Sequence, residues 1–172
     1  MLKCHISERM TLAPFYEFEE VVALDEPKAF EEGLIATFFA YDLLHEAGYE
    51  SYQPWKQKQE LILPAFVLWK KEKESIRSAF AARKVSEVKK PMLQFTANFL
   101  SLMYWLNGKP VNNASQWKNV VASFSYKPVN IEERFEFILM RPAHHHAFTQ
   151  LEQLYTELEK QAQKCFIYEK KA

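Results

Sequence analysis

The stretch SEVKKPMLQFTANFLSLMYWL, Ser86 to Leu106, decides the fold class of this 172-residue chain. Its apolar side chains recur at steps of three and four, and they cover most of the circumference of the helix that this spacing predicts. A narrow strip is left polar or amphipathic, namely Gln94, Asn98, Ser101 and Trp105. A helix that is apolar on nearly all sides belongs in the middle of a bundle, so we expect this helix at the centre of the fold.

The composition agrees with a helical protein that has one continuous core. Hydrophobic residues make up 48% of the chain, and its three glycines leave little material for tight hairpins or phosphate-binding loops. A chain of this length is the size of one domain. We therefore predict a single all-α domain over residues 1–172, an up-and-down-like bundle of about five to seven helices, with residues 1–20 irregular.

Proline and glycine set the predicted ends of the other helices. The first helix is expected from Pro27 to Ala47, because acidic residues and a proline open it and Gly48 ends it. Pro64 should kink or break the next helical segment, since proline lacks an N–H donor and clashes with the carbonyl four residues earlier. The remaining predicted helices cover residues 65–84, residues 114–122, residues 131–140 and the chain from Pro142 onward.

Two similar segments, GKPVNN at Gly108 to Asn113 and YKPVNI at Tyr126 to Ile131, each precede a predicted helix. Asn130 is expected to cap the second of these helices, with Glu133 placed to complete a capping box. In the alternative interpretation, the lysines and the helix N-termini form a surface that attracts anions.

Charge is uneven along a chain whose net charge is zero. Residues 1–50 hold 11 acids and 3 bases (net −8), residues 51–90 hold 4 and 10 (net +6), and the remainder holds 7 and 9 (net +2). We expect the acidic residues to oppose a phosphate backbone and to pair with the basic helix instead, so nucleic-acid binding is the weaker alternative.

Localisation follows from the apolar runs. The most apolar run, Phe95 to Leu106, is twelve residues long, against roughly twenty for a bilayer-spanning helix. The first twenty residues lack the uninterrupted apolar segment of a secretory signal. Cys4 and Cys165 match no metal or redox spacing. We expect a cytoplasmic protein that has no membrane association and keeps its cysteines reduced.

The stretch MRPAHHHAF, Met140 to Phe148, holds three consecutive histidines at the start of the last helix. The predicted buried stripe of that helix consists of Phe148, Leu151, Leu154, Tyr155, Leu158, Ala162 and Cys165. At 100° per residue His144 lies near the middle of this stripe, while His145 and His146 point away on opposite sides. Diverging side chains cannot hold one ion together, but with Arg141 nearby they suit a small anion or an acidic partner.

A metal site would therefore need ligands from elsewhere. Asp42 and His45 have the i, i+3 spacing that lines metal sites in helical bundles, so a metal-dependent enzyme using them with histidines of the 144–146 run is one hypothesis, with zinc or iron as the metal. Against it, no second such pair exists, and His45 falls on an apolar stripe. Phosphate-loop, nucleophile-elbow and zinc-protease motifs are absent as well, so we favour a protein without catalytic activity or a cofactor.

WLNGKPV (Trp105 to Val111), Trp117 and the run from Tyr126 to Lys160 stand together in the C-terminal half of the chain. They resemble the signature half of the YpoC-like family of small proteins from Bacillus-type bacteria. The resemblance implies an all-helical, cytoplasmic bacterial protein of this size, and it carries over no activity, cofactor or catalytic residue.

We therefore predict an interaction module that binds an as yet unidentified protein through exposed aromatic and basic side chains. The metal-dependent enzyme, and weak binding of nucleic acid or an anion, are the alternatives. The candidate binding residues are Trp105, Lys109, Trp117, Lys127, Arg134, Arg141, His144 and His145.

Overall fold

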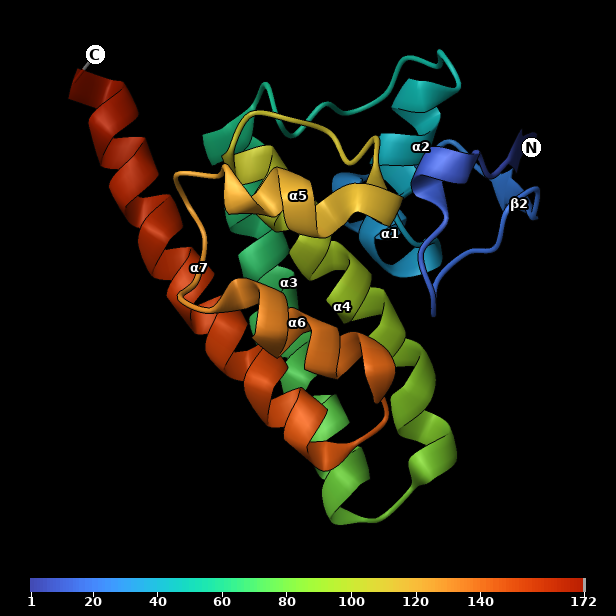
Figure 1. Ribbon diagram of the computed structural model, residues 1–172, viewed down its shortest axis with the longest axis vertical. Helices are drawn as coiled ribbons and strands as arrows, with labels where there is room; N and C mark the ends of the chain where they lie inside the picture. Colours follow the sequence, from blue (N-terminus) through green and yellow to red (C-terminus); the bar gives the residue numbers. More distant parts are fainter. Residues whose placement is uncertain (172) are drawn as a thin grey trace.

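The computed structural model describes residues 1–171, within which seven α-helices carry most of the chain. The three longest helices are α3 (Lys58–Ala81), α4 (Val85–Leu106) and α7 (His145–Lys171), and each contacts the other two. Figure 1 shows that the short helices α1, α2 and α5 gather at one end of the long ones, which differs from a regular up-and-down bundle. The remaining elements are η1 (Glu8–Met10), α1 (Phe30–Ala36), α2 (Ala40–Glu46), η2 (Ala114–Gln116), α5 (Trp117–Ala122) and α6 (Ile131–Met140).

A two-stranded antiparallel sheet corrects the all-α expectation. Strand β1 (Leu2–His5) pairs with β2 (Val21–Leu24), with Leu2 opposite Leu24 and His5 opposite Val21. The strands are joined by residues 6–20, which include η1, so this sheet needs no glycine-based hairpin turn. The fold is therefore mainly α-helical, with β1 inside residues 1–20, which we expected to be irregular, and β2 directly after them.

The helix predicted from Pro27 to Ala47 is two helices, α1 and α2. The chain leaves the helical conformation at Thr37 (φ −148°, ψ 141°) and turns through a left-handed Phe39 (φ 55°). The rings of Phe38 and Phe39 both pack edge-on against Phe15, each with centroids 5.3 Å apart. Adjacent residues of a continuous helix point about 100° apart, so the break lets two neighbouring rings meet the same partner. The predicted end at Gly48 is confirmed, with φ 82°.

The polar strip of α4 is buried and faces this break. Asn98 Nδ2 donates to the Leu34 carbonyl at 2.7 Å, and Gln94 Nε2 donates to the Thr37 carbonyl at 3.3 Å. These carbonyls lie at the C-terminal end of α1, where a helix leaves acceptors without partners. The strip therefore satisfies buried backbone groups that the interruption of the helix exposes.

The other predicted boundaries hold in part. Helix α4 is confirmed and ends at Leu106, followed by a left-handed Gly108 (φ 82°) and by the Lys109 N–H, which reaches the Tyr104 carbonyl at 3.1 Å. Helix α6 matches its prediction, but Asn130 has a left-handed backbone and its side chain makes no capping hydrogen bond, so the predicted capping box is wrong. Helix α3 continues through Pro64. Pro64 has no N–H to donate to the Glu60 carbonyl, but Glu60 is exposed, so water can donate to that carbonyl instead.

The core lies where α3, α4 and α7 meet. The rings of Trp69 and Tyr155 stack with centroids 4.2 Å apart, and the Tyr155 hydroxyl donates to the Phe95 carbonyl. The stripe predicted for the last helix, from Phe148 to Cys165, is buried as expected, although α7 begins at His145 rather than at Pro142. None of the helices within residues 1–171 has both the length and the apolar composition that crossing a bilayer requires.

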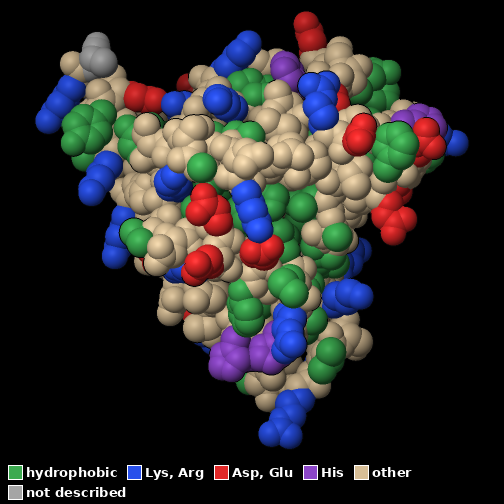
Figure 2. Space-filling model, in the orientation of Figure 1, with side chains coloured by type: hydrophobic (Ala, Val, Ile, Leu, Met, Phe, Trp, Pro, Cys, Tyr) green, Lys and Arg blue, Asp and Glu red, His purple; other side chains and the backbone are tan. Residues whose placement is uncertain are grey.

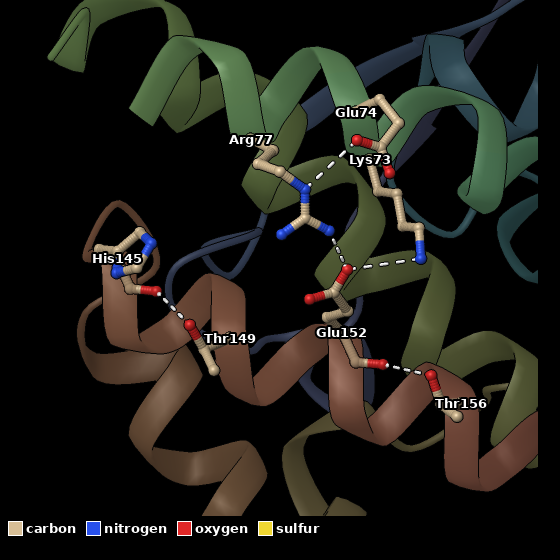
Figure 3. A network of polar contacts seen from close by, with 7 residues as sticks. All are labelled: Lys73, Glu74, Arg77, His145, Thr149, Glu152 and Thr156. Carbon is tan, nitrogen blue, oxygen red and sulfur yellow. Dashed lines mark hydrogen bonds and ion pairs between the residues drawn. The ribbon is translucent and has the colours of Figure 1, made fainter. Parts of the chain in front are cut away.

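The basic segment pairs with α7 and not, as predicted, with the acidic N-terminal residues. In the part of the chain that the structure describes, no ion pair joins residues 1–50 to residues 51–90. Figure 3 shows Glu152 of α7 between Lys73, at 3.4 Å, and Arg77, which also pairs with Glu74. Two further pairs along the same interface are Lys58–Glu169 at 2.7 Å and Lys70–Glu159 at 2.5 Å. Much of the positive charge of α3 is thus already engaged.

The polar strip gives the first testable prediction. Asn98→Ala should lower the free energy of unfolding by about 2 to 3 kcal/mol, because it leaves the buried Leu34 carbonyl without a donor. Asn119→Ala, at an exposed position of α5, is the matched control and should change stability by less than about 0.5 kcal/mol. Urea unfolding measures both, and equal effects in the two variants would contradict this role of the strip.

Candidate functional site

Asp42, on the first turn of α2, is the most deeply placed acidic residue, with 1% of its surface exposed. Its Oδ1 accepts hydrogen bonds from Trp105 Nε1 at 2.9 Å and from the Val111 N–H at 2.7 Å, and its Oδ2 accepts one from Ser101 Oγ at 2.9 Å. One carboxylate thus joins α2, the polar strip of α4 and the loop that follows α4.

Burial sets the protonation of this carboxyl group. Removal from water raises the pKa of Asp42 to about 6, and the hydrogen bonds from Trp105, Val111 and Ser101 oppose that rise. The carboxylate oxygens are buried and accept hydrogen bonds from three donors within the protein, so we assign Asp42 a structural role.

The residues of the hypothesised metal enzyme do not converge. His45 is exposed, and its ring packs edge-on against Trp55 with centroids 4.9 Å apart, so its predicted place on a buried stripe is wrong. Asp42 adjoins the C-terminal end of α4, whereas His145 lies beside Phe80, near the opposite end of the α3–α4 pair (Figure 1). The rise of α4 separates these ends by roughly 30 Å. Within residues 1–171, no group of three or more His, Cys, Asp or Glu side chains could hold a metal ion.

Both tryptophans among the predicted binding residues are buried, which corrects the expectation that they are exposed anchors. Trp105 is 1% exposed and bonds to Asp42, and Trp117 is 4% exposed with its ring edge-on to Phe135 at 5.1 Å. Their indole rings serve the core and have no surface to offer a partner.

Three of the predicted basic residues make contacts within the chain. Lys127 Nζ donates to the carbonyls of Val121 and Ala122, at 3.1 and 2.6 Å, and so caps the end of α5. Arg134 holds both carboxylate oxygens of Glu157 at 2.9 and 2.8 Å. Lys109 lies over the ring of Phe124 at 6.0 Å.

Arg141 and His144 lie in the connection between α6 and α7, and His145 is the first residue of α7. His144 lies outside the helix, where its Nδ1 accepts the His146 N–H at 3.2 Å and its ring stacks on that of His146 at 5.1 Å. The predicted divergence is therefore wrong for His144 and His146, and His144 is exposed rather than part of the buried stripe. The ring of His145 lies against Phe80, with centroids 5.5 Å apart.

Two apolar side chains that sequence reasoning missed lie beside these residues. Phe137 and Met140 are 38% and 76% exposed, on the face of α6 opposite its buried residues. Figure 2 shows hydrophobic side chains next to histidine and Lys or Arg near the lower end of this face. We call this region the elbow surface and define it as Phe137, Met140, Arg141, His144 and His146. The signal in the sequence was that Phe137 and Met140 fall outside the stripe of Ile131, Phe135 and Ile138.

Comparison with known proteins gives a match over the part of the chain that holds α3 to α7. The family model described as YpoC-like protein matches residues 55–170, the segment from just before α3 into the last turn of α7. The chain belongs to the YpoC-like family. It is 33% identical over 107 residues to the uncharacterized protein YpoC of Bacillus subtilis (strain 168), a match that covers 62% of this chain and 65% of that protein. No solved structure matches the chain.

The region matched by the YpoC-like family model includes the three hydrogen-bond donors to Asp42 but not Asp42 itself. Ser101, Trp105 and Val111 lie inside the matched region, whereas Asp42 and the strands precede it. The elbow surface lies entirely inside it.

Truncating Asp42 should destabilise the protein strongly. Asp42→Ala leaves three buried donors without an acceptor, and we expect unfolding free energy to fall by about 3 to 5 kcal/mol. Asp42→Asn is the matched control, because its carbonyl can accept from Trp105 and Val111 while its amide donates to Ser101 Oγ. Denaturant unfolding should place Asp42→Asn far closer to the wild type, and equal losses would contradict this hydrogen-bonding scheme.

Stability should also depend on pH through Asp42. The folded-state pKa of Asp42, about 6, is above the ordinary value of 3.8, so folding favours the protonated carboxyl group. This contribution to the free energy of unfolding, about 3 kcal/mol, is complete below pH 4 and is lost as the pH rises through 6. Relative to the wild type, Asp42→Asn should therefore gain stability between pH 4 and pH 7. A stability difference that stays constant over this range would show that burial does not raise the pKa.

Proposed function

We propose that this YpoC-like chain is a non-enzymatic, cytoplasmic interaction module that binds an acidic segment of a partner protein through the elbow surface. Met140 carries the proposal, because it is 76% exposed beside Arg141, whose side chain has no ion-pair partner within residues 1–171. Arginine and large apolar side chains are enriched where proteins bind each other.

Positive charge at this end of the molecule supports an acidic partner. The turn between α3 and α4 lies at the same end as the connection between α6 and α7 (Figure 1), and it exposes Arg83 and Lys84. Lys84 reaches an acidic side chain, Glu87, at 3.9 Å, while Arg83 makes no ion pair in the described chain. Facing charges of opposite sign steer association and favour the correct partner.

The apolar part of the elbow surface supports a protein rather than a nucleic acid as the partner. Met140 and Phe137 are one turn apart on α6, so they offer a continuous apolar contact next to the charges. Methionine adapts its shape to a partner surface. Binding to phosphate backbones depends on charge and gains little from such a contact.

Affinity capture from a bacterial lysate tests the proposal. We expect the wild-type chain to retain a protein with an acidic segment, and expect Arg141→Glu to reduce the amount retained at least tenfold through charge repulsion. Met140→Ser should reduce it as well, because the apolar anchor is lost. Arg9→Glu, at an exposed arginine of η1, is the matched control and should retain the partner fully.

Two results would contradict the proposal. One is equal capture by the wild type, Arg141→Glu and Met140→Ser. The other is recovery of nucleic acid that Met140→Ser retains as well as the wild type does, since that dependence on charge alone identifies a phosphate-binding surface.

A further inference from the structure

A shallow apolar groove runs along α3, away from the elbow surface. It is lined by Leu63, Pro64, Val67 and Leu68, and Glu31 of α1 and Lys71 complete its lining. Val67 is 65% exposed, which is unusual for a β-branched apolar residue in the middle of a long helix. The residues of α3 that pair with α7, from Lys58 to Arg77, do not line this groove. This face of α3 is therefore free in the described chain.

The exposed line of α3 through this groove is complementary to itself. Glu60, Pro64, Val67 and Lys71 follow one another at steps of four, three and four, so they lie in one row along the helix. The row has an acid at one end, a base at the other and apolar residues between them. Neither Glu60 nor Lys71 forms an ion pair within residues 1–171.

An antiparallel copy of the same row matches it residue for residue. The spacing is symmetric about the point midway between Pro64 and Val67, so a two-fold axis there sets Pro64 of each copy against Val67 of the other. The same axis sets Glu60 of each copy against Lys71 of the other, which gives two equivalent ion pairs. A self-complementary patch of this kind is what an isologous dimer requires.

We propose that the groove binds a second copy of this chain, with α3 packed antiparallel on α3 across a two-fold axis between Pro64 and Val67. This inference is independent of the proposed function, because the elbow surface contributes nothing to it. The row is about 16 Å long. A contact this small suits a reversible dimer with a dissociation constant on the order of 10 to 100 µM.

Sedimentation equilibrium of the full chain, from about 1 to about 500 µM, tests the dimer. Lys71→Glu and Glu60→Lys each place like charges opposite one another, and each should raise the dissociation constant at least tenfold. The double variant Glu60→Lys/Lys71→Glu restores both pairs with their signs exchanged, so it should dimerise within about threefold of the wild type. Lys89→Glu, at an exposed position of α4, alters the net charge as Lys71→Glu does and should leave the dimer unchanged.

The charge exchange distinguishes this pairing of helices from a general effect of net charge on association. The three substituted positions, Glu60, Lys71 and Lys89, are all exposed, so circular dichroism and melting should be the same for every variant. A wild-type chain that remains monomeric throughout this range would overturn the proposal. A double variant as weak as either single variant would also overturn it, as would an equal loss in Lys89→Glu.

Discussion

A single buried carboxylate joins the N-terminal elements of this molecule to its central helix and to the loop that follows that helix. Asp42 comes from the N-terminal elements, and it accepts hydrogen bonds from Ser101 and Trp105 of the central helix and from the backbone of Val111 in the next loop. An acidic side chain buried without such donors would cost several kcal/mol, so the position of α2 and the path of the loop are fixed together. The loop in turn leads to η2, which packs on η1 and so closes the N-terminal end of the molecule.

Elements with sustained apolar periodicity could be predicted from sequence, and those set by distant contacts could not. The central helix and the stripe from Phe148 to Cys165 were predictable because their own residues decide which face is buried. The break after Thr37 was not, because it depends on Phe15, a ring more than twenty residues away. For the same reason the polar strip of α4 was visible as a pattern, while its role as a set of donors depended on where the end of α1 lies.

The candidate surface shows the same limit at the level of single side chains. The grouping of Arg141 with the histidines followed from their adjacency in sequence, but the stacking of His144 on His146 required the observed start of α7. A tryptophan among apolar neighbours can be an exposed anchor or a core residue, and the Nε1 partner that decides the matter for Trp105 is Asp42, more than sixty residues earlier. Met140 could have been found, since it stands outside the buried stripe of its own helix.

The dependence of the fold on Asp42 is the central claim, and amide hydrogen exchange of Val111 tests it most directly. The Val111 N–H belongs to a loop, and its acceptor is the carboxylate of Asp42 at 2.7 Å. If that contact is as described, this amide exchanges only through global unfolding, as slowly as the amides in the middle of α4. Exchange of Val111 as fast as that of exposed Asn112, the next residue in the loop, would contradict the account.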